Sequence, residues 1–146
     1  MEMIFAIRLM RCLVYRHDIR ERAREETIVT AHKRVLPAVN TDAVFAYVRE
    51  DERVLQARMF APLDTIIEDP ATGSAAAATI ALLAMLRTND EEECSWTVSQ
   101  GVDMGRPSMI SGFTAKRSGA IETVAISGRV RPVMQGQISL DTSVAL

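Results

Sequence analysis

The pattern of apolar positions predicts one helix that has no polar side. Residues 73–87 read GSAAAATIALLAMLR, and the first charge in this run is Arg87. A helix that is apolar all round is typically buried, so we expect the rest of the domain to wrap around it. The preceding residues, 68–72, are polar or small and include Pro70. They therefore predict a loop that leads into a core helix.

The start of this helix has two possible registers. Asp69 could cap it with Pro70 at the first helical position, or Thr72 or Ser74 could be the cap. Because glycine costs about 1 kcal/mol inside a helix, we place the start at Gly73 or Ser74 and leave Asp69 in the loop. Unpaired backbone N–H groups and the positive end of the helix dipole then face the loop, which suits a carboxylate or phosphate. The loop is the candidate site, and the alternative is that Asp69 only caps a core helix.

Alternating positions predict a mostly antiparallel sheet around the helix. Residues 43–48 and 54–60 read as a hairpin, and Leu55, Ala57 and Met59 share the face that can cover the helix. Trp96, within the alternating residues 95–99, is expected in the core. The remaining predicted strands form a meander over residues 109–114, 120–126, 130–134 and 137–140. Arg129 and Arg131 are expected to lie on a solvated sheet edge.

The first 42 residues give weaker patterns. Met3, Phe5, Ile7 and Leu9 alternate as in a strand, although residues 4, 7 and 10 could form a helical stripe. The charged residues 18–26 are typical of a solvated surface helix. The apolar start is interrupted by arginines, is shorter than the ~20 residues that span a bilayer and lacks a signal-peptide pattern. We therefore expect a cytoplasmic chain that does not enter the membrane.

Composition suits one domain with a real core, because 48% of the 146 residues are hydrophobic and 25% are charged. The net charge of -2 gives no reason to expect a nucleic-acid partner, which usually needs a basic face. The two cysteines and two histidines have no metal-ligand spacing. No G-x-G-x-x-G follows a strand, and no P-loop lysine follows Gly73 and Ser74. We therefore expect neither a metal nor a cofactor.

Four motifs together resemble the PhzF-like family of phenazine-biosynthesis isomerases. They are RMFAP at 58–62, EDPATGSA at 68–75, QGVDMGRPS at 100–108 and GRVRPVMQG at 128–136, in the family's order. The resemblance covers about residues 43–140 and corresponds to the second of two lobes. It implies the diaminopimelate epimerase-like fold, an α+β architecture in which each lobe curls a mostly antiparallel sheet around a central helix, here about 73–87. Residues 1–42 would be a divergent N-terminal segment and connection, and residues 43–146 the lobe.

The resemblance also implies a function. Such a chain would be a cofactor-independent isomerase or epimerase that moves a proton on a small carboxylate-bearing substrate by acid/base chemistry. By the motif match, Asp69 would hold or relay the proton and Ser74 would hydrogen-bond the substrate, with Thr72 and the Gly73 backbone also binding it. Arg106 could bind an acidic group or the carbonyls of its own loop, so it is left outside the catalytic set.

This chain departs from the family in length. The two-lobed enzymes are nearly twice as long and carry their principal acid/base glutamate in the first lobe, and nothing in residues 1–40 resembles that lobe. The expectation is half an active site, completed by a separate first lobe or by an identical copy in a homodimer. The alternatives are a non-catalytic anion-binding or scaffold domain, or a truncated fragment of a longer protein.

Overall fold

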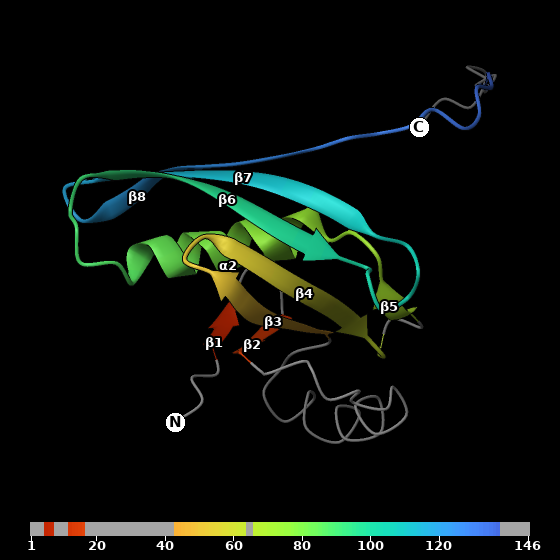
Figure 1. The fold of residues 1–146 in the computed structure, drawn as a ribbon, viewed down its shortest axis with the longest axis horizontal. Coiled ribbons are helices and arrows are strands. Elements are labelled where there is room, and N and C mark those ends of the chain that lie inside the picture. The colour runs from red at the N-terminus through yellow and green to blue at the C-terminus, as the bar shows by residue number, and fades with distance from the viewer. Residues whose placement is uncertain (1–4, 8–11, 17–42, 64–65, 138–146) are drawn as a thin grey trace, which may run out of the picture.

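The computed structural model describes residues 5–7, 12–16, 43–63 and 66–137, which form one curved sheet and one helix (Figure 1). The strands and the helix are β1 (Phe5–Ile7), β2 (Cys12–Arg16), β3 (Ala43–Asp51), β4 (Val54–Ala61), β5 (Ile66–Asp69), α2 (Gly73–Met85), β6 (Glu92–Gln100), β7 (Ser108–Arg117) and β8 (Ala120–Gly128). The main path through the sheet runs β1-β2-β3-β4-β6-β7-β8, and β5 pairs with β4 outside this path.

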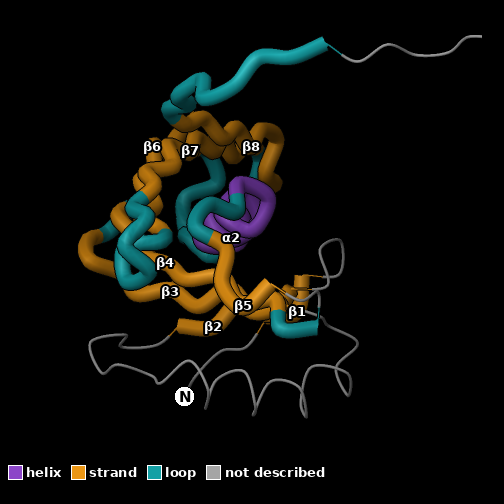
Figure 2. Tube along the Cα trace, turned by 90° about the vertical axis from the view of Figure 1, so that its right-hand side faces the viewer, coloured by secondary structure: helices purple, strands orange, loops and turns teal. Residues whose placement is uncertain are grey.

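The sheet curls around α2, as the sequence predicts. In Figure 2, strands β6, β7 and β8 lie on one side of the helix and β3, β4 and β5 on the other. Most neighbours are antiparallel, whereas β2 with β3 and β4 with β6 are parallel. A parallel pair needs a long crossover, and the segment that contains α2 provides it between β4 and β6. The α+β fold with a curved, mostly antiparallel sheet is therefore confirmed.

The helix begins at Gly73, as predicted, and ends at Met85, two residues before the expected end. Its buried residues are Ala75, Ala76, Thr79, Ile80, Leu83 and Ala84. The other side of the helix is only partly buried, at Ala77, Ala78, Ala81 and Leu82. The expectation that the helix is buried on every side is therefore correct for one side only. The sheet lies very close to the buried side, because a Cβ atom on Gly112 of β7 would lie 2.5 Å from Cδ1 of Ile80.

The predicted hairpin is also confirmed, as is the prediction of which β4 side chains face the core. β3 and β4 pair antiparallel, and Leu55, Ala57 and Met59 belong to the hydrophobic core. Trp96 is 2% exposed, and its ring N–H donates to Oγ1 of the buried Thr114 at 2.9 Å. Strands β7 and β8 continue the sheet as the meander predicted. The short strand β5 was not expected, since its four residues show no alternation.

The predicted strand over residues 130–134 is wrong. Residues 129–137 follow β8 without joining the described sheet, and Figure 1 shows this segment leaving the body of the molecule. Val130, Val133 and Met134 are at least 90% exposed. An alternating run forms a strand only when it finds an edge to pair with, and Pro132 also lacks an N–H for a ladder. Arg129 and Arg131 are exposed as expected, but they do not lie on a sheet edge.

The N-terminal predictions are tested in part. Phe5–Ile7 is a strand, and Cys12–Arg16 is a further strand that the sequence reasoning did not identify. The predicted helix over residues 18–26 lies outside the described residues, as does nearly all of the predicted strand 137–140. Within the described ranges, no helix has both the length and the hydropathy to cross a membrane.

Candidate functional site

Strand β5 places Glu68 and Asp69 on opposite faces of the sheet. It pairs antiparallel with β4, with Asp69 opposite Met59 and Ile66 opposite Ala61. Because neighbouring side chains on a strand point to opposite sides, the two carboxylates have different partners. Glu68 binds Arg58, and Asp69 accepts a hydrogen bond from Thr72. The two acidic residues of the motif thus have separate roles.

The Arg58 and Glu68 side chains form a buried, two-pronged ion pair. Nε of Arg58 donates to Oε1 of Glu68 at 2.9 Å and Nη2 donates to Oε2 at 2.8 Å, while the side chains are 8% and 4% exposed. The guanidinium also lies 4.9 Å from the centre of the Phe60 ring, and its Nε lies 3.6 Å from Oδ2 of Asp103. A planar fork of this kind fixes geometry as well as charge. The pair therefore anchors β5, which carries Asp69, to β4.

A second set of hydrogen bonds holds the segment between β5 and α2. The Thr72 hydroxyl donates to Oδ2 of Asp69 at 2.5 Å. The Gln100 carboxamide accepts from the Thr72 backbone N–H at 3.1 Å, and its Nε2 donates to the Asp69 carbonyl at 2.7 Å and to the Thr72 hydroxyl at 3.0 Å. Gly101 lies beside Pro70 in the same place, since a Cβ there would lie 2.9 Å from the Pro70 carbonyl oxygen. The end of β6 thus positions the loop.

The start of α2 is open. Thr72 is the N-cap residue, and no side chain makes a capping hydrogen bond. The Ala76 N–H donates to the Thr72 carbonyl at 3.0 Å, so the amides of residues 73–75 precede the first helical hydrogen bond. The first turn has no acidic residue, and Ser74 is exposed. The placement of the helix start is confirmed, and Asp69 lies at the end of β5, where its carboxylate binds a hydroxyl and does not cap the helix.

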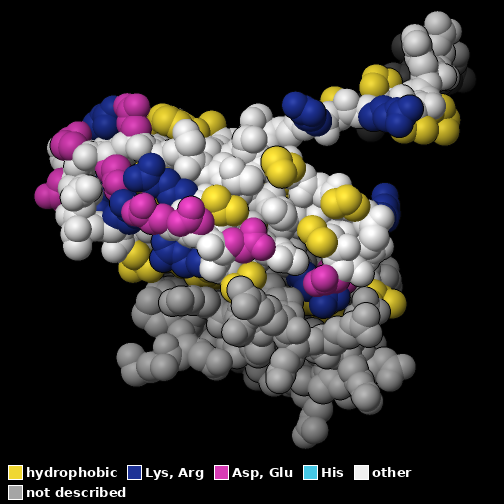
Figure 3. Space-filling view, in the orientation of Figure 1, with side chains coloured by type: hydrophobic (Ala, Val, Ile, Leu, Met, Phe, Trp, Pro, Cys, Tyr) yellow, Lys and Arg dark blue, Asp and Glu magenta, His cyan; other side chains and the backbone are white. Residues whose placement is uncertain are grey.

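Exposed apolar side chains surround this end of the lobe. They come from the loop after β4, from β5, from the turn after β6 and from the start of β7: Leu63 (40% exposed), Ile66 (50%), Ile67 (59%), Val102 (45%) and Met109 (66%). We refer to these five residues as the apolar rim. Figure 3 shows exposed hydrophobic atoms at the right-hand end of the molecule, where Figure 1 places β5. Other exposed apolar side chains, among them Met85, Leu86 and Val124, lie away from this end, and the five of the apolar rim are the ones near the start of α2.

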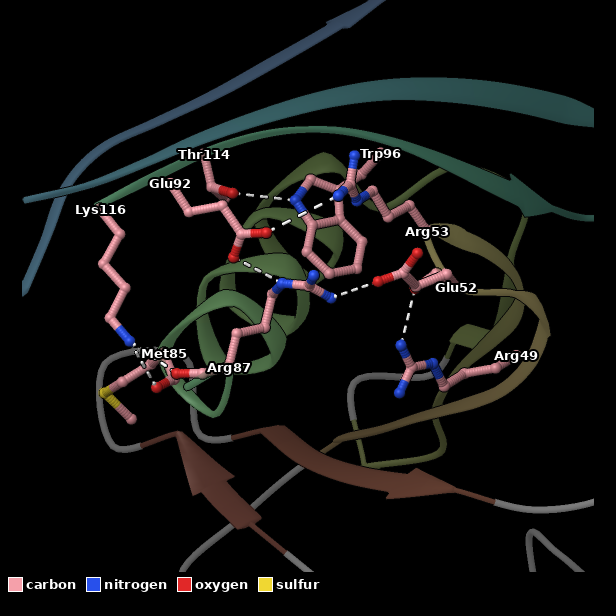
Figure 4. Close-up of polar contacts among 9 residues, drawn as sticks. All are labelled: Arg49, Glu52, Arg53, Met85, Arg87, Glu92, Trp96, Thr114 and Lys116. Atoms are coloured by element: carbon pink, nitrogen blue, oxygen red, sulfur yellow. Dashed lines mark hydrogen bonds and ion pairs between the residues drawn. The ribbon is translucent and has the colours of Figure 1, made fainter. Parts of the chain in front are cut away.

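A separate polar cluster lies at the other end of α2 (Figure 4). Arg87 binds Glu92 at 2.6 Å and Glu52 at 2.9 Å, and these bonds raise the pKa of Arg87 above its ordinary value. The bond from Arg87 lowers the pKa of Glu92, and burial raises the pKa of the free thiol of Cys94. The charges of Arg87, Glu92 and Glu52 pair with one another, so these ion pairs hold the chain that follows the helix.

The structure brings the predicted site residues together at the start of α2. Asp69, Thr72, Gly73 and Ser74 are consecutive or nearly so, whereas Arg106 is exposed in the loop after β6. The sequence reasoning missed Gln100 as a site residue. The alternation of β6 could have marked Gln100 as an inward residue, since Trp96 and Val98 are also inward, but it does not indicate contact with Asp69 or Thr72. No group of three or more histidine, cysteine, aspartate or glutamate side chains within the described ranges could hold a metal ion.

The comparisons with known proteins agree on one family. The family described as phenazine biosynthesis-like protein, PhzC-PhzF, matches residues 14–136, a wider range than the four motifs cover. An uncharacterized isomerase of Mesorhizobium japonicum is 32% identical over 97 residues, which are 64% of this chain and 32% of that protein. An uncharacterized isomerase of Deinococcus radiodurans is 38% identical over 91 residues, 59% of this chain and 29% of that protein. The chain therefore spans about a third of the length of these relatives.

A solved structure supports the fold. The crystal structure of the Bacillus anthracis phenazine biosynthesis protein of the PhzF family superposes with a TM-score of 0.61 at 20% sequence identity. The matched region covers 80% of this chain and 42% of the Bacillus chain. Coverage of less than half of that chain is consistent with one lobe.

Proposed function

Because the chain belongs to the phenazine biosynthesis-like (PhzC-PhzF) family, we propose that it is an isomerase lobe that moves a proton on a small carboxylate-bearing substrate without a cofactor. The observation that carries this proposal is the Asp69 carboxylate, which Thr72 holds beside the uncapped start of α2. A fixed carboxylate next to unpaired N–H donors can exchange a proton with a bound anion.

The substrate carboxylate would bind at the start of α2. The amides of Gly73 and Ser74 and the Ser74 hydroxyl are the donors, and no acidic residue in the first turn repels an anion. Asp69 lies four residues before Gly73, so a substrate held there brings the carbon beside its carboxylate near the Asp69 side chain.

A second acid/base group has to come from elsewhere. Among the described residues near Asp69, the Glu68 carboxylate is bound by both prongs of Arg58, and Asp103 lies in an exposed loop 3.6 Å from the same guanidinium. We propose that the apolar rim docks the missing half, either a separate first lobe or a second copy of this chain. A second copy would form an isologous dimer with two Asp69 loops across one cleft.

The test is exchange of a carbon-bound hydrogen for deuterium. The full chain is incubated in heavy water with a panel of small carboxylic acids that carry a hydrogen on the carbon next to the carboxylate, and loss of that hydrogen is followed by NMR. Asp69→Asn should lower the exchange rate by at least about 10²-fold, the usual contribution of a general acid or base. Its melting temperature should stay near that of the wild type, because the oxygen of the introduced carboxamide can still accept from Thr72.

Asp90→Asn is the matched control, since Asp90 is an exposed aspartate in the loop after α2. This variant should exchange at the wild-type rate. If Asp69→Asn keeps its activity but melts several degrees lower, the carboxylate has a structural role. If the wild-type chain binds a carboxylate at the start of α2 but exchanges no hydrogen in any assembly, the chain is a non-catalytic anion-binding domain.

A further inference from the structure

Gln100 is a fully buried amide whose hydrogen bonds all go to the segment that carries Asp69. Its exposed fraction is 0%, and it lies at the end of β6, 28 residues after Thr72. Its oxygen and nitrogen reach the Thr72 N–H, the Asp69 carbonyl and the Thr72 hydroxyl within 2.7–3.1 Å. A buried carboxamide is costly unless its donors and acceptor are paired. Here both N–H groups and the oxygen are paired within one short segment.

The chemistry of the partners fixes the direction of each hydrogen bond. The Thr72 backbone N–H can only donate, so the oxygen of the carboxamide must face it. The Asp69 carbonyl can only accept, so the nitrogen must lie at the other end. That nitrogen has a second N–H, which it donates to the Thr72 hydroxyl. The hydroxyl oxygen therefore acts as an acceptor from Gln100, and its own hydrogen points to Oδ2 of Asp69.

This chain of hydrogen bonds makes the two oxygens of Asp69 unequal. Oδ2 accepts from a hydroxyl whose hydrogen cannot point towards Gln100, because the Gln100 N–H occupies that side of the hydroxyl oxygen, whereas no group among the described residues donates to Oδ1. We infer that Gln100 is a positioning residue, which acts through the Thr72 hydroxyl to hold the Asp69 carboxylate with Oδ2 occupied and Oδ1 open. This inference rests on the proposed function and assigns the reacting oxygen within it.

The proton transfer can then be written at one atom. The C–H bond beside the substrate carboxylate breaks, and its electron pair delocalises into that carboxylate. The proton forms an O–H bond with a lone pair of Oδ1, and Asp69 becomes neutral while the substrate gains the negative charge. Return of a proton to carbon reverses both changes, so no oxidant or other reactant is required. Throughout, the Thr72 hydroxyl remains a donor to Oδ2 and does not exchange its proton with the substrate.

Separate variants remove the hydroxyl and change the carboxamide. Thr72→Val deletes only the hydroxyl and keeps the backbone contacts to Gln100, whereas Thr72→Ser restores a hydroxyl. Gln100→Glu keeps an acceptor for the Thr72 N–H. When ionised, the introduced carboxylate has no donor for the Thr72 hydroxyl, so the hydroxyl hydrogen can turn towards that carboxylate. Thr79→Val is the matched control, because the buried Thr79 hydroxyl donates to the Ala75 carbonyl at 2.8 Å and does not contact Asp69.

The experiment combines crystal structures of the full-length variants with the deuterium-exchange assay. In Thr72→Val we expect the backbone of residues 69–72 to stay in place and the Asp69 carboxylate to rotate or split between two conformers. The turnover number should fall by about 10²-fold, as for a misplaced reacting group, with KM changed by less than about threefold. Thr72→Ser should restore the wild-type carboxylate position and recover most of the rate lost in Thr72→Val, and Thr79→Val should retain the wild-type carboxylate position and rate.

Gln100→Glu combined with Thr72→Val should lose less rate than the two single losses multiplied together, because the part of the Gln100→Glu loss that acts through the Thr72 hydroxyl is already present in Thr72→Val, and only the lost donor to the Asp69 carbonyl is new. An unchanged Asp69 conformer and rate in Thr72→Val would overturn the inference, as would losses that add in the double variant. If the wild-type chain exchanges no hydrogen in any assembly, the proposed function fails. The Asp69 conformers in the Thr72→Val and Thr72→Ser crystals then still decide whether the hydroxyl positions the carboxylate.

Discussion

At the scale of single residues, the candidate site depends on Gly101, a glycine directly after β6 that packs against the loop at Pro70. Gly101 has a φ of +72°, and a Cβ on it would lie 2.4 Å from the Arg106 carbonyl oxygen and 2.9 Å from that of Pro70. Gly105 has nearly the same φ, +70°, but no atom lies within 4 Å of its Cβ position. The two glycines therefore separate the cost of a left-handed backbone from the cost of a close approach.

We expect Gly105→Ala to lower the free energy of unfolding by about 1 kcal/mol, the cost of placing a side chain in the left-handed region. Gly101→Ala should cost about 1–3 kcal/mol more, because overpacking against backbone atoms is added. Urea unfolding of both variants measures this difference. Equal losses would mean that the Pro70 loop moves aside easily, and would argue against a rigid site.

The sequence identified the site residues that lie near one another along the chain. The helix start follows from Gly73 and the apolar run after it, so Asp69, Thr72 and Ser74 could be placed from local pattern. Gln100 could not be assigned to them, because a spacing of 28 residues says nothing about contact until the sheet is assembled. The same applies to the Arg58 and Glu68 pair, which forms only when β5 folds back along β4.

At the scale of elements, α2 is stabilised at its end by a residue of the sheet. The last turn of the helix has no basic residue of its own. Lys116 of β7, only 4% exposed, donates to the Met85 carbonyl at 3.3 Å and to the Arg87 carbonyl at 2.8 Å. A cation near the last carbonyls of a helix is favourable both as a donor and by charge.

Lys116→Met should therefore lower the free energy of unfolding by about 1.5–3 kcal/mol, since it removes two part-buried hydrogen bonds of a charged donor. Arg117→Met is the neighbouring control. Arg117 is 43% exposed in its ion pair with Glu93, and such surface pairs contribute about 0–1 kcal/mol. Thermal and urea unfolding give both values. A neutral Lys116→Met, or a larger loss in Arg117→Met, would contradict this account of the helix end.

Element ends were the least accurate part of the sequence prediction, and for a physical reason. The apolar run continues to Leu86, yet the helix ends at Met85, where the chain must turn back so that Arg87 can reach Glu92 and Glu52. Residues 130–134 have strand-like composition but pair with no strand in the described part of the chain. Both outcomes depend on tertiary partners, which local periodicity does not contain.

At the scale of the whole molecule, the first three of the four motifs, which begin at residues 58, 68 and 100, supply residues at one end of the lobe. Most of the fourth motif, at 128–136, follows β8 outside the sheet. Gln100 of β6 and Asp69 of β5 meet at the segment before α2, and Arg58 of β4 holds β5 from the other face of the sheet through Glu68. The apolar rim lies around the same end, whereas the ion pairs of Arg87 lie at the other end of the helix. The candidate site therefore lies at the end of the molecule that carries the apolar rim.

This arrangement predicts that the rim, and not another exposed apolar residue, controls self-association. If two copies complete one site, Ile67→Lys should shift the chain from dimer to monomer, because it places a charge in the apolar contact. Met85→Lys is the control, since Met85 is about as exposed (54% against 59%) but lies at the far end of α2. Light scattering over a range of concentrations measures both, and deuterium exchange should decline with the dimer. Two outcomes would rule out a site made by two facing Asp69 loops. One is a wild-type chain that stays monomeric, and the other is a dimer that Met85→Lys disrupts and Ile67→Lys leaves intact. Either outcome would leave a separate first lobe as the partner.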